Sequence, residues 1–447
     1  MMTFAVPAAL RRRYPFAALA RPMTGVMSGV SAINVHLGEP RFQLRSTSVG
    51  NMTMAFPHVH SGGGDLSDRV LGGAGADMDG EIAWLRAVVE GAERYAMSVH
   101  EPADFIVDTN RALGDAALDL RLVPVCSPRE LADPRCPLRA PDRDAPIRWV
   151  RGYSLTDRRE RLVPAIMTHL FVTARAGERF WNPISTGVAA HTSLAAALVS
   201  AICEVIERDA IALTWLLRLP LARIETSAAP PQLATSLAHM QKTQVASYLF
   251  DATTDLGVPT VYAVQTCDGK RAIDVFVGCA TSCDAEATCV KTLREMAAGR
   301  SVVRLERTIP ERIEDFIELS HGAAYYARGG RRDAFAFLLD GEARTDVGAM
   351  AARAGFDTAA TDEDKLAILI DRLRAGGHDV IAVDLTTDEL RAAGLWVVRV
   401  VIPGLMPFTT VHRARYLGTP RLYEYPRRAG FVPRDEADIN PDPQPFA

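Results

Sequence analysis

Apolar positions along the chain alternate between helical spacing and short runs rich in β-branched residues. Apolar residues at helical spacing predict helices over 81–99, 193–217 and 284–305, and a mostly helical region over 310–378. Strands are predicted at 41–56, 147–155, 162–172, 258–267, 273–281, 378–386 and 395–404. Because the two kinds of element are interleaved, we expect an α/β fold (mixed α+β), with helices packed on mixed sheets.

Glycine and proline mark the segments between these elements. The glycine-rich stretches 61–68 and 72–77 are predicted to be flexible loops. No linker demands two independent domains, so we expect one domain over 25–432 after an N-terminal extension over 1–24. A tail over 433–447 follows, and Pro441, Pro443 and Pro445 make its end extended rather than helical.

Charged residues interrupt the most apolar of the predicted helices. Within 193–217 the segment "EVIERDA" places Glu204, Glu207 and Arg208 among aliphatic neighbours. A helix that is apolar nearly all round is expected to be buried, and buried carboxylates cost several kcal/mol unless they are paired or bind a metal. These charges therefore need a specific partner.

The same charge pattern occurs earlier in the chain. "EGAERYA" repeats the ExxER spacing with Glu90, Glu93 and Arg94, 114 residues before the second copy. Chance gives roughly 0.1 such matches in a chain of this length, so we interpret the two as an internal pseudo-repeat. Glutamates three residues apart share a helix face, so each copy points two carboxylates the same way. The helix over 284–305 adds Glu295 and Arg300.

Two kinds of site satisfy these charges. Oxygen ligands without histidine or cysteine among them suit Mg²⁺, which commonly also binds phosphate oxygens, so a Mg²⁺-nucleotide site without a phosphate-binding glycine loop is one interpretation. A structural network of ion pairs between packed helices is the other.

Composition narrows the function classes. The 447 residues are 48% hydrophobic and 23% charged, with a net charge of −4 and no basic block, so a nucleic-acid partner is not expected. We expect no signal peptide and no membrane span, and the seven cysteines, without a CxxC pair, indicate reduced thiols in a cytoplasmic protein.

These motifs together resemble the YcaO superfamily, over nearly the whole chain from about residue 24. The motif SxxExxER corresponds to "AVVEGAER" (87–94), and the motif NG…ExxERDA corresponds to "TGVAAH…EVIERDA". The motif ExxQxR corresponds to "EMAAGR" (295–300), and GKG corresponds to "GAG" (73–75). This chain departs from the family pattern at Ala74, Ala87, Thr186, His191 and Ala298.

The resemblance implies a YcaO fold in which acidic residues hold Mg²⁺ against the phosphates of ATP and arginines contact phosphate. The implied nucleotide-binding residues are Glu90, Glu93, Arg94, Glu204, Glu207, Arg208, Glu295 and Arg300. Of these, Glu90, Glu204, Glu207 and Glu295 are the implied metal ligands. Four of these five departures, at Ala74, Ala87, Thr186 and Ala298, remove polar groups near ATP and indicate a subfamily with other contacts or an inactive member.

The family activates backbone amides of ribosomally made precursor peptides. In its azoline-forming cyclodehydratase branch, a Cys, Ser or Thr side chain attacks the preceding carbonyl, and the oxyanion takes the γ-phosphoryl group of ATP. A PxPxP tail reaches the active site in that branch, which implies catalytic roles for Pro441, Pro443 and Pro445. Thioamide or amidine formation, and a non-catalytic scaffold, remain alternatives.

The resemblance also implies partners. Because residues 1–24 leave no room for a fused leader-binding domain, we expect a separate partner protein to deliver the peptide. We also expect a flavin-dependent dehydrogenase later in the pathway, and a homodimer.

Overall fold

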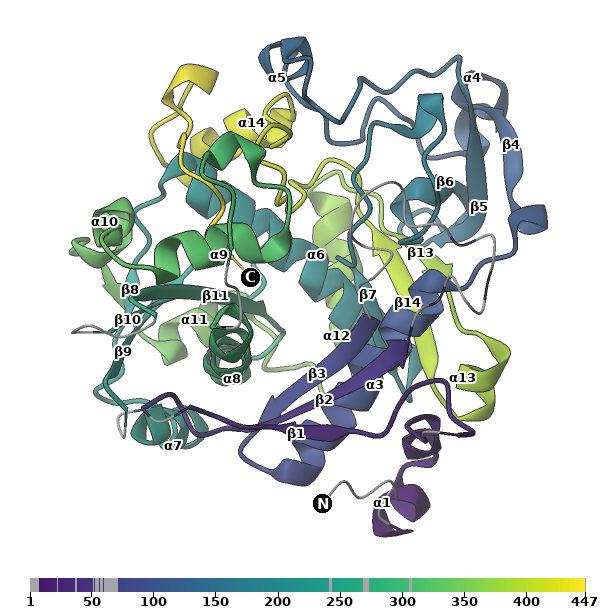
Figure 1. Cartoon of the computed structure of the whole chain (residues 1–447). Helices are drawn as coiled ribbons and strands as arrows, with labels where there is room; N and C mark the ends of the chain where they lie inside the picture. Colours follow the sequence, from purple (N-terminus) through teal and green to yellow (C-terminus); the bar gives the residue numbers. More distant parts are fainter. Residues whose placement is uncertain are drawn as a thin grey trace.

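The computed structural model describes residues 8–21, 23–36, 38–50, 52, 56, 59, 71–240, 243–267, 273–304 and 308–446. Within these ranges the strands form three sheets, and three long helices lie between them (Figure 1). The long helices are α3 (Gly80–Ser98), α6 (Leu194–Leu217) and α8 (Ala285–Val303). This arrangement confirms the predicted mixed α/β class and the three helix predictions.

The three-stranded sheet is antiparallel, in the order β1-β2-β3, and α3 covers it. Its strands are β1 (Ser31–Ile33), β2 (Gln43–Gly50) and β3 (Leu71–Asp77). The six-stranded sheet has the order β4-β5-β13-β14-β7, with β6 paired to β5. Its strands are β4 (Ile106–Thr109), β5 (Pro146–Ser154), β6 (Arg159–Pro164), β7 (Val188–His191), β13 (Ile381–Asp384) and β14 (Trp396–Val401).

The five-stranded sheet has the order β11-β10-β9-β8-β12 and is mixed, because β12 pairs with β8 in parallel while the other pairs are antiparallel. Its strands are β8 (Arg223–Ile224), β9 (Val245–Asp251), β10 (Thr260–Cys267), β11 (Val275–Thr281) and β12 (Arg344–Thr345). Every residue of β10 and β11 is buried.

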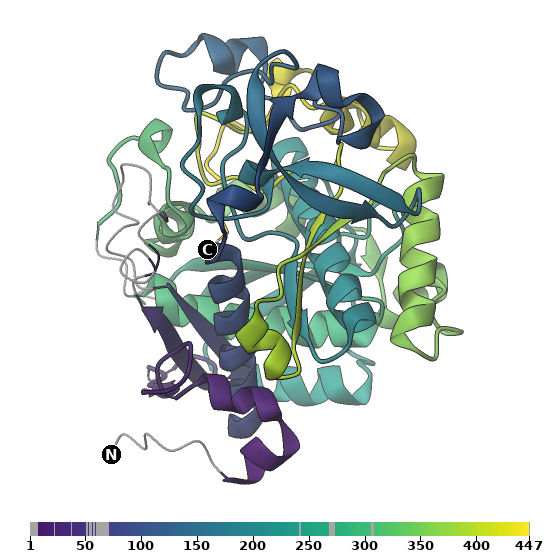
Figure 2. The same ribbon diagram turned by 90° about the vertical axis from the view of Figure 1, so that its right-hand side faces the viewer.

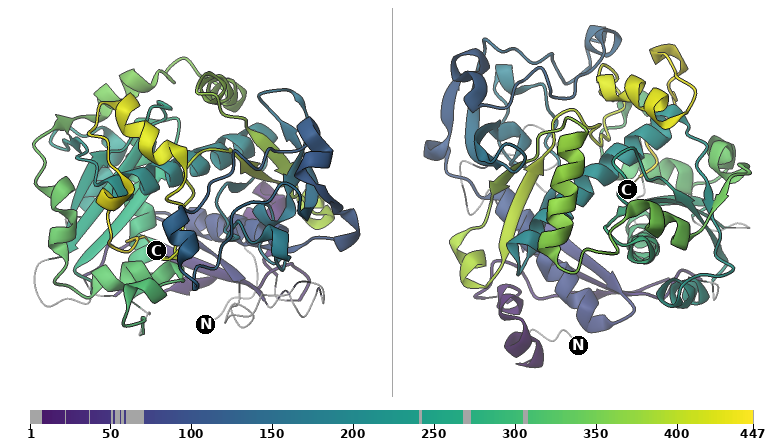
Figure 3. Two further views of the ribbon diagram at one scale, coloured as in Figure 1. Left: turned by 90° about the horizontal axis from the view of Figure 1, so that it is seen from above. Right: turned by 180° about the vertical axis from the view of Figure 1, so that it is seen from behind.

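Shorter helices surround this framework (Figures 2 and 3). They are α1 (Ala8–Arg13), α4 (Asn110–Leu113), α5 (Pro128–Ala132), α7 (Pro231–Met240), α9 (Leu319–Ala327), α10 (Ala336–Leu339), α11 (Val347–Ala354), α12 (Asp362–Ala375), α13 (Asp388–Ala392) and α14 (Pro420–Ala429). Among the described residues, no helix is both long and apolar enough to cross a bilayer.

The predicted flexible loop at 72–77 is wrong, because these residues form β3. Glycine is needed here for close packing, not for flexibility. A Cβ at Gly73 would lie 2.1 Å from the carbonyl oxygen of Ala87, and one at Gly75 would lie 2.0 Å from that of Ala83. The glycines therefore let β3 rest directly on the backbone of α3. The other predicted glycine-rich loop, 61–68, lies outside the described residues.

The C-terminal tail is docked, and its end reaches the centre of the molecule between α6 and α9 (Figures 1 and 3). Asn440 is fully buried, and its side chain donates to the carbonyl oxygen of Trp215 on α6. The Trp215 Nε1–H donates in turn to the carbonyl oxygen of Asp442. Pro443, Pro445 and Phe446 are buried as well. The tail is extended, as its prolines predict.

Candidate functional site

The two ExxER motifs lie on α3 and α6 and make matching hydrogen bonds. In each copy the first glutamate pairs with the arginine four residues later, Glu90 with Arg94 at 3.0 Å and Glu204 with Arg208 at 3.2 Å. The same glutamate also accepts a backbone N–H from a strand beside its own helix. Ala74 on β3 donates to Glu90 at 2.9 Å, and Gly187, just before β7, donates to Glu204 at 2.8 Å.

The second glutamate of each motif accepts a backbone N–H from a strand that lies further along the chain or across the site from its helix. Glu93 on α3 accepts the backbone N–H of Ala190 on β7 at 2.9 Å. Glu207 on α6 accepts that of Thr281 on β11 at 3.0 Å. The predicted pseudo-repeat is therefore repeated in the bonding pattern, and each carboxylate pair links its helix to two strand regions that are distant from each other in the sequence.

Two of these carboxylates are buried with less positive charge around them than their ionised forms need. Burial raises the pKa of Glu93 to about 8. The positive charge of Arg94 offsets part of this rise, and the negative charges of Glu90 and Glu204 add to it. Burial also raises the pKa of Glu207, which is 2% exposed, although Lys291 and Arg208 oppose the shift. A bound cation would stabilise both ionised forms.

Glu295 on α8 lies beside the second motif. Lys291 bridges it to Glu207, with its Nζ 3.9 Å from a Glu295 oxygen and 3.5 Å from a Glu207 oxygen. Burial lowers the pKa of Lys291, but the carboxylates of Glu295 and Glu207 more than reverse this and raise it overall. Lys291 was not singled out from the sequence, although it is one of only four lysines in the chain.

Arg300 lies apart from the other predicted site residues. It is 1% exposed and its Nε is 2.6 Å from an oxygen of Glu39, which Arg304 also contacts. Five residues along a helix turn a side chain well away from that of Glu295. The structure thus links seven of the eight predicted nucleotide-binding residues pairwise, through ion pairs and the mutual effects of their charges, and places Arg300 in a buried ion pair.

Arg399 is a further candidate site residue, outside the motifs that the sequence shows. It lies on β14, is 3% exposed, and donates to the carbonyl oxygen of Ile184 at 2.8 Å, while its buried Nε has no hydrogen-bond partner among the described residues. Burial lowers its pKa to about 10, with Glu204 opposing the shift and Arg94 adding to it. The signal was a lone arginine inside the apolar strand "WVVRVV".

The carboxylates are spread out rather than gathered at one point. In the described part of the chain, no three His, Cys, Asp or Glu side chains lie close enough together to hold a metal ion by themselves. Mg²⁺ is commonly bound through one or two carboxylates plus substrate phosphates. The hard oxygen donors present fit such an ion.

The tail comes close to the second motif through two aromatic rings. Phe446 packs edge-on against Tyr262 of β10 and against Phe408, with ring centroids 5.3 and 6.3 Å apart. The Arg208 guanidinium lies over the Phe408 ring, 5.4 Å from its centroid. The end of the tail is therefore separated from Arg208 by a single side chain.

Comparison with known proteins identifies the family. The family model described as YcaO cyclodehydratase, ATP- and Mg²⁺-binding, matches residues 65–406. This chain belongs to the YcaO family, and the cofactors predicted from the sequence, ATP and Mg²⁺, are those by which the family is described.

Three similar proteins can be compared with this chain. A heterocyclase solved in complex with substrate and cofactor has a TM-score of 0.80 and 19% identity, covering 99% of this chain and 57% of its own. YcaO from Methanopyrus kandleri, bound with AMPPCP and Mg²⁺, has a TM-score of 0.59 and 18% identity, covering 89% and 88%. An uncharacterized protein in the tfuA 3' region of Rhizobium leguminosarum bv. trifolii is 29% identical over 199 residues, covering 42% of this chain and 44% of the relative.

These comparisons confirm the YcaO fold. The chain spans less than half of the Rhizobium relative and little more than half of the heterocyclase chain. At these levels of identity the solved structures establish the fold alone.

Proposed function

We propose that the protein is an ATP- and Mg²⁺-dependent cyclodehydratase that acts on a backbone amide of a peptide substrate. The observation that carries the proposal is the pair of ExxER motifs, in which burial raises the pKa of Glu93 to about 8 and that of Glu207 above its ordinary value. Such pairs are short of positive charge, and the Mg²⁺ that accompanies a bound nucleotide would supply it.

Each group of side chains has a role in this site. Glu90, Glu204, Glu207 and Glu295 are the proposed metal ligands, and Arg94 and Arg208 are the proposed phosphate contacts. Mg²⁺, when bound, would neutralise phosphate charge and orient the γ-phosphoryl group. The backbone N–H donors from Ala74 and Gly187 hold Glu90 and Glu204 in fixed orientations before any ligand arrives.

The proposed reaction removes one water from the peptide. A Cys, Ser or Thr side chain of the substrate gives up its thiol or hydroxyl proton to solvent and attacks the preceding carbonyl carbon, and the former amide oxygen becomes an oxyanion. That oxygen takes the γ-phosphoryl group of ATP, which releases ADP. Loss of the amide N–H proton and departure of the oxygen as phosphate then leave the C=N bond of a thiazoline or oxazoline ring. The enzyme contributes positioning and charge stabilisation.

The tail is proposed to complete the site. Buried Pro443 and Pro445 carry the chain to Phe446, which packs on Phe408 beneath Arg208. In this position Pro441, Pro443 and Pro445 act by fixing the end of the chain beside the reacting groups. A heterocyclase with the same fold was solved with substrate and cofactor bound, which supports a ring-forming reaction here.

The test combines the protein with a Cys/Ser/Thr-rich precursor peptide encoded beside it, and with any leader-binding protein encoded there. We expect a mass decrease equal to one water for each ring, with one ADP and one phosphate released per ring. Glu204→Gln and Glu207→Gln should each abolish both signals. A matched control is Glu160→Gln, because the Glu160 side chain is 81% exposed on β6.

The product mass decides between chemistries. Exchange of amide oxygen for sulfur would indicate thioamide formation and would refute the cyclodehydratase assignment. Failure of calorimetry to detect Mg-ATP binding, with the partner protein present, would instead indicate a scaffold. Ring formation that persists in Glu204→Gln would show that the site is assigned wrongly.

A further inference from the structure

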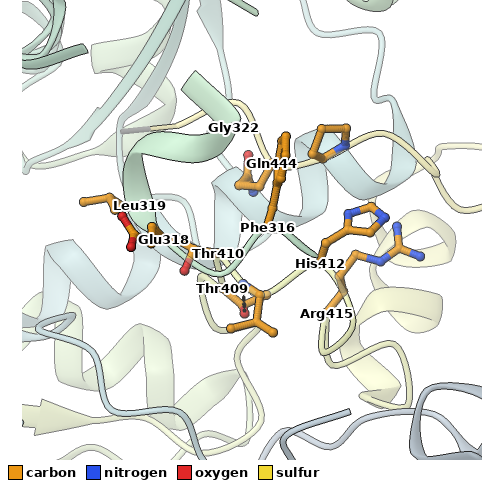
Figure 4. Close-up of a pocket in the computed structure, with 11 residues that line it drawn as sticks. Phe316, Glu318, Leu319, Gly322, Thr409, Thr410, His412, Arg415 and Gln444 are labelled. Carbon is orange, nitrogen blue, oxygen red and sulfur yellow. Dashed lines mark hydrogen bonds between the residues drawn. The ribbon is translucent and has the colours of Figure 1, made fainter. Parts of the chain in front are cut away.

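The cavity beside the docked tail is too small for a substrate or a cofactor. Its volume is about 20 Å³, and the start of α9, residues 409–415 and the tail line it (Figure 4). A single water molecule needs about 10–15 Å³ of such volume, so this space holds water. The chemistry that is not yet explained lies instead among the charged side chains of the second ExxER motif.

Lys291 on α8 lies between two carboxylates of unequal exposure. Its Nζ is 3.5 Å from an oxygen of Glu207 and 3.9 Å from an oxygen of Glu295. The side chain of Glu207 is 3% exposed, whereas that of Glu295 is 45% exposed. The ammonium group of Lys291, on a side chain that is 31% exposed, thus bridges a buried carboxylate and one that solvent reaches.

In the described part of the chain, the first ExxER motif has no lysine in the corresponding place. There Glu93 accepts a backbone N–H from β7, and its neighbour Arg94 pairs with Glu90. In the second motif the arginine pairs in the same way, but α8 adds the ammonium group of Lys291 at the buried Glu207. The two copies therefore differ by one cation that comes from outside the motif.

A lysine in this position competes with a metal ion. Glu207 and Glu295 are proposed metal ligands, and both contact the ammonium group of Lys291 in the ligand-free protein. A metal ion that arrived beside the ammonium would be repelled by it. The ammonium is a point charge on a flexible four-carbon stem, so it can swing aside. Mg²⁺ carries twice its charge and needs only one or two carboxylates, because it keeps several waters.

We propose that Lys291 is the resident counter-ion of the second ExxER motif, and that a metal ion binds Glu207 and Glu295 by displacing its ammonium group. Nucleotide phosphate receives the displaced ammonium, and this step rests on the proposed function. Metal binding at this motif is thereby coupled to nucleotide binding. Metal alone binds it weakly, because the ammonium then has no anion to move to.

The experiment measures binding of Mn²⁺ alone to the full chain by electron paramagnetic resonance, which detects the ion that stays free. Mn²⁺ suits the same oxygen ligands as Mg²⁺. Lys291→Gln removes the ammonium group, and Lys291→Met removes it with a second uncharged side chain if glutamine disturbs the fold. Lys291→Arg keeps the charge. The matched control is Lys365→Gln, because Lys365 pairs with Asp362 at 3.1 Å and its side chain is 35% exposed.

We expect Lys291→Gln to bind Mn²⁺ about tenfold more tightly than the unaltered protein, because a competing positive charge is removed. Lys291→Arg and Lys365→Gln should bind Mn²⁺ as the unaltered protein does. Adding Glu295→Gln to Lys291→Gln should remove the gain, which places the extra binding at this motif. Equal affinity in Lys291→Gln and the unaltered protein, or a gain that survives Glu295→Gln, would overturn the proposal.

Nucleotide binding distinguishes a displaced counter-ion from a lysine that only supports the fold. In calorimetry Lys291→Gln should bind Mg-ATP about tenfold more weakly, because phosphate loses its ammonium partner, although the same variant binds Mn²⁺ more tightly. Mg-ATP affinity that rises together with Mn²⁺ affinity would overturn the transfer to phosphate. If the unaltered protein binds no Mg-ATP while Lys291→Gln still gains Mn²⁺ affinity, only the proposed function is refuted.

Discussion

Replacement of Glu93 by glutamine should stabilise the ligand-free protein while destroying nucleotide binding. Glutamine keeps the oxygen that accepts the Ala190 backbone N–H at 2.9 Å, but it carries no charge. The pKa of Glu93 rises from 4.5 to about 8, chiefly through burial. Folding therefore favours the protonated carboxyl group, and its ionised form opposes folding.

The size of the effect follows from linkage. Because the folded pKa is raised, the stabilisation from protonated Glu93 is complete below about pH 4.5 and is lost as the pH rises to about 8. The difference of about 3.5 pH units corresponds to about 5 kcal/mol, at about 1.4 kcal/mol per unit. Glutamine avoids this loss, so the gain in Glu93→Gln should be about 2 kcal/mol near pH 6 and about 5 kcal/mol above pH 8.

Urea unfolding of the ligand-free protein near pH 6 and near pH 9 measures this gain. With Mg-ATP at 100 times its Kd, the unaltered protein should gain about 2.7 kcal/mol, and Glu93→Gln should gain nothing. Glu160→Gln controls for loss of one negative charge, and its effect should be equal at both pH values. A gain in Glu93→Gln that is the same at both pH values would refute a raised pKa of Glu93 in the folded protein.

Three further changes test other parts of the structure. Gly73→Ala places a Cβ 2.1 Å from the carbonyl oxygen of Ala87, so it should lower the free energy of unfolding in urea by about 1–3 kcal/mol. The control Ala74→Ser, at an exposed neighbouring position, should change this free energy little. Arg399→Met should weaken Mg-ATP binding about tenfold in calorimetry with an unchanged circular dichroism spectrum, and unchanged affinity would remove Arg399 from the site. Phe446→Ala should reduce ring formation while Mg-ATP affinity is retained, and a parallel loss of both would contradict a separate role for the tail.

The spacing of apolar and charged residues was sufficient to predict the main helices and both ExxER motifs, because residues that share a buried helix face recur every three or four positions in the sequence. The β3 segment was mistaken for a loop because Gly73 and Gly75 have no side chain, and their role appears only when α3 lies against them. The backbone donors for Glu93 and Glu207 come from β7 and β11. Such contacts depend on tertiary packing, which no local pattern encodes.

The positions that depart from the family pattern do not all affect the charges of the site. Ala87 is fully buried where β3 crosses α3, and Ala298 packs against the apolar cluster that contains Phe42 and Leu44. Both therefore belong to helix–sheet packing. Ala74 is different. Its backbone N–H donates to Glu90 and its side chain is exposed. Where the family pattern has a lysine, this chain therefore lacks an ammonium group beside Glu90.

Lys291 supplies an ammonium group elsewhere, between Glu207 and Glu295. In a chain with only four lysines, one lies among the carboxylates of the second motif. Together with Arg399 near Glu204, it places positive charge beside the acidic residues. The loss at Ala74 is thus matched by cations on α8 and β14, and the acidic residues stay in place. This favours a rearranged nucleotide site over a decayed one, because ionised buried carboxylates without a function would only destabilise the fold.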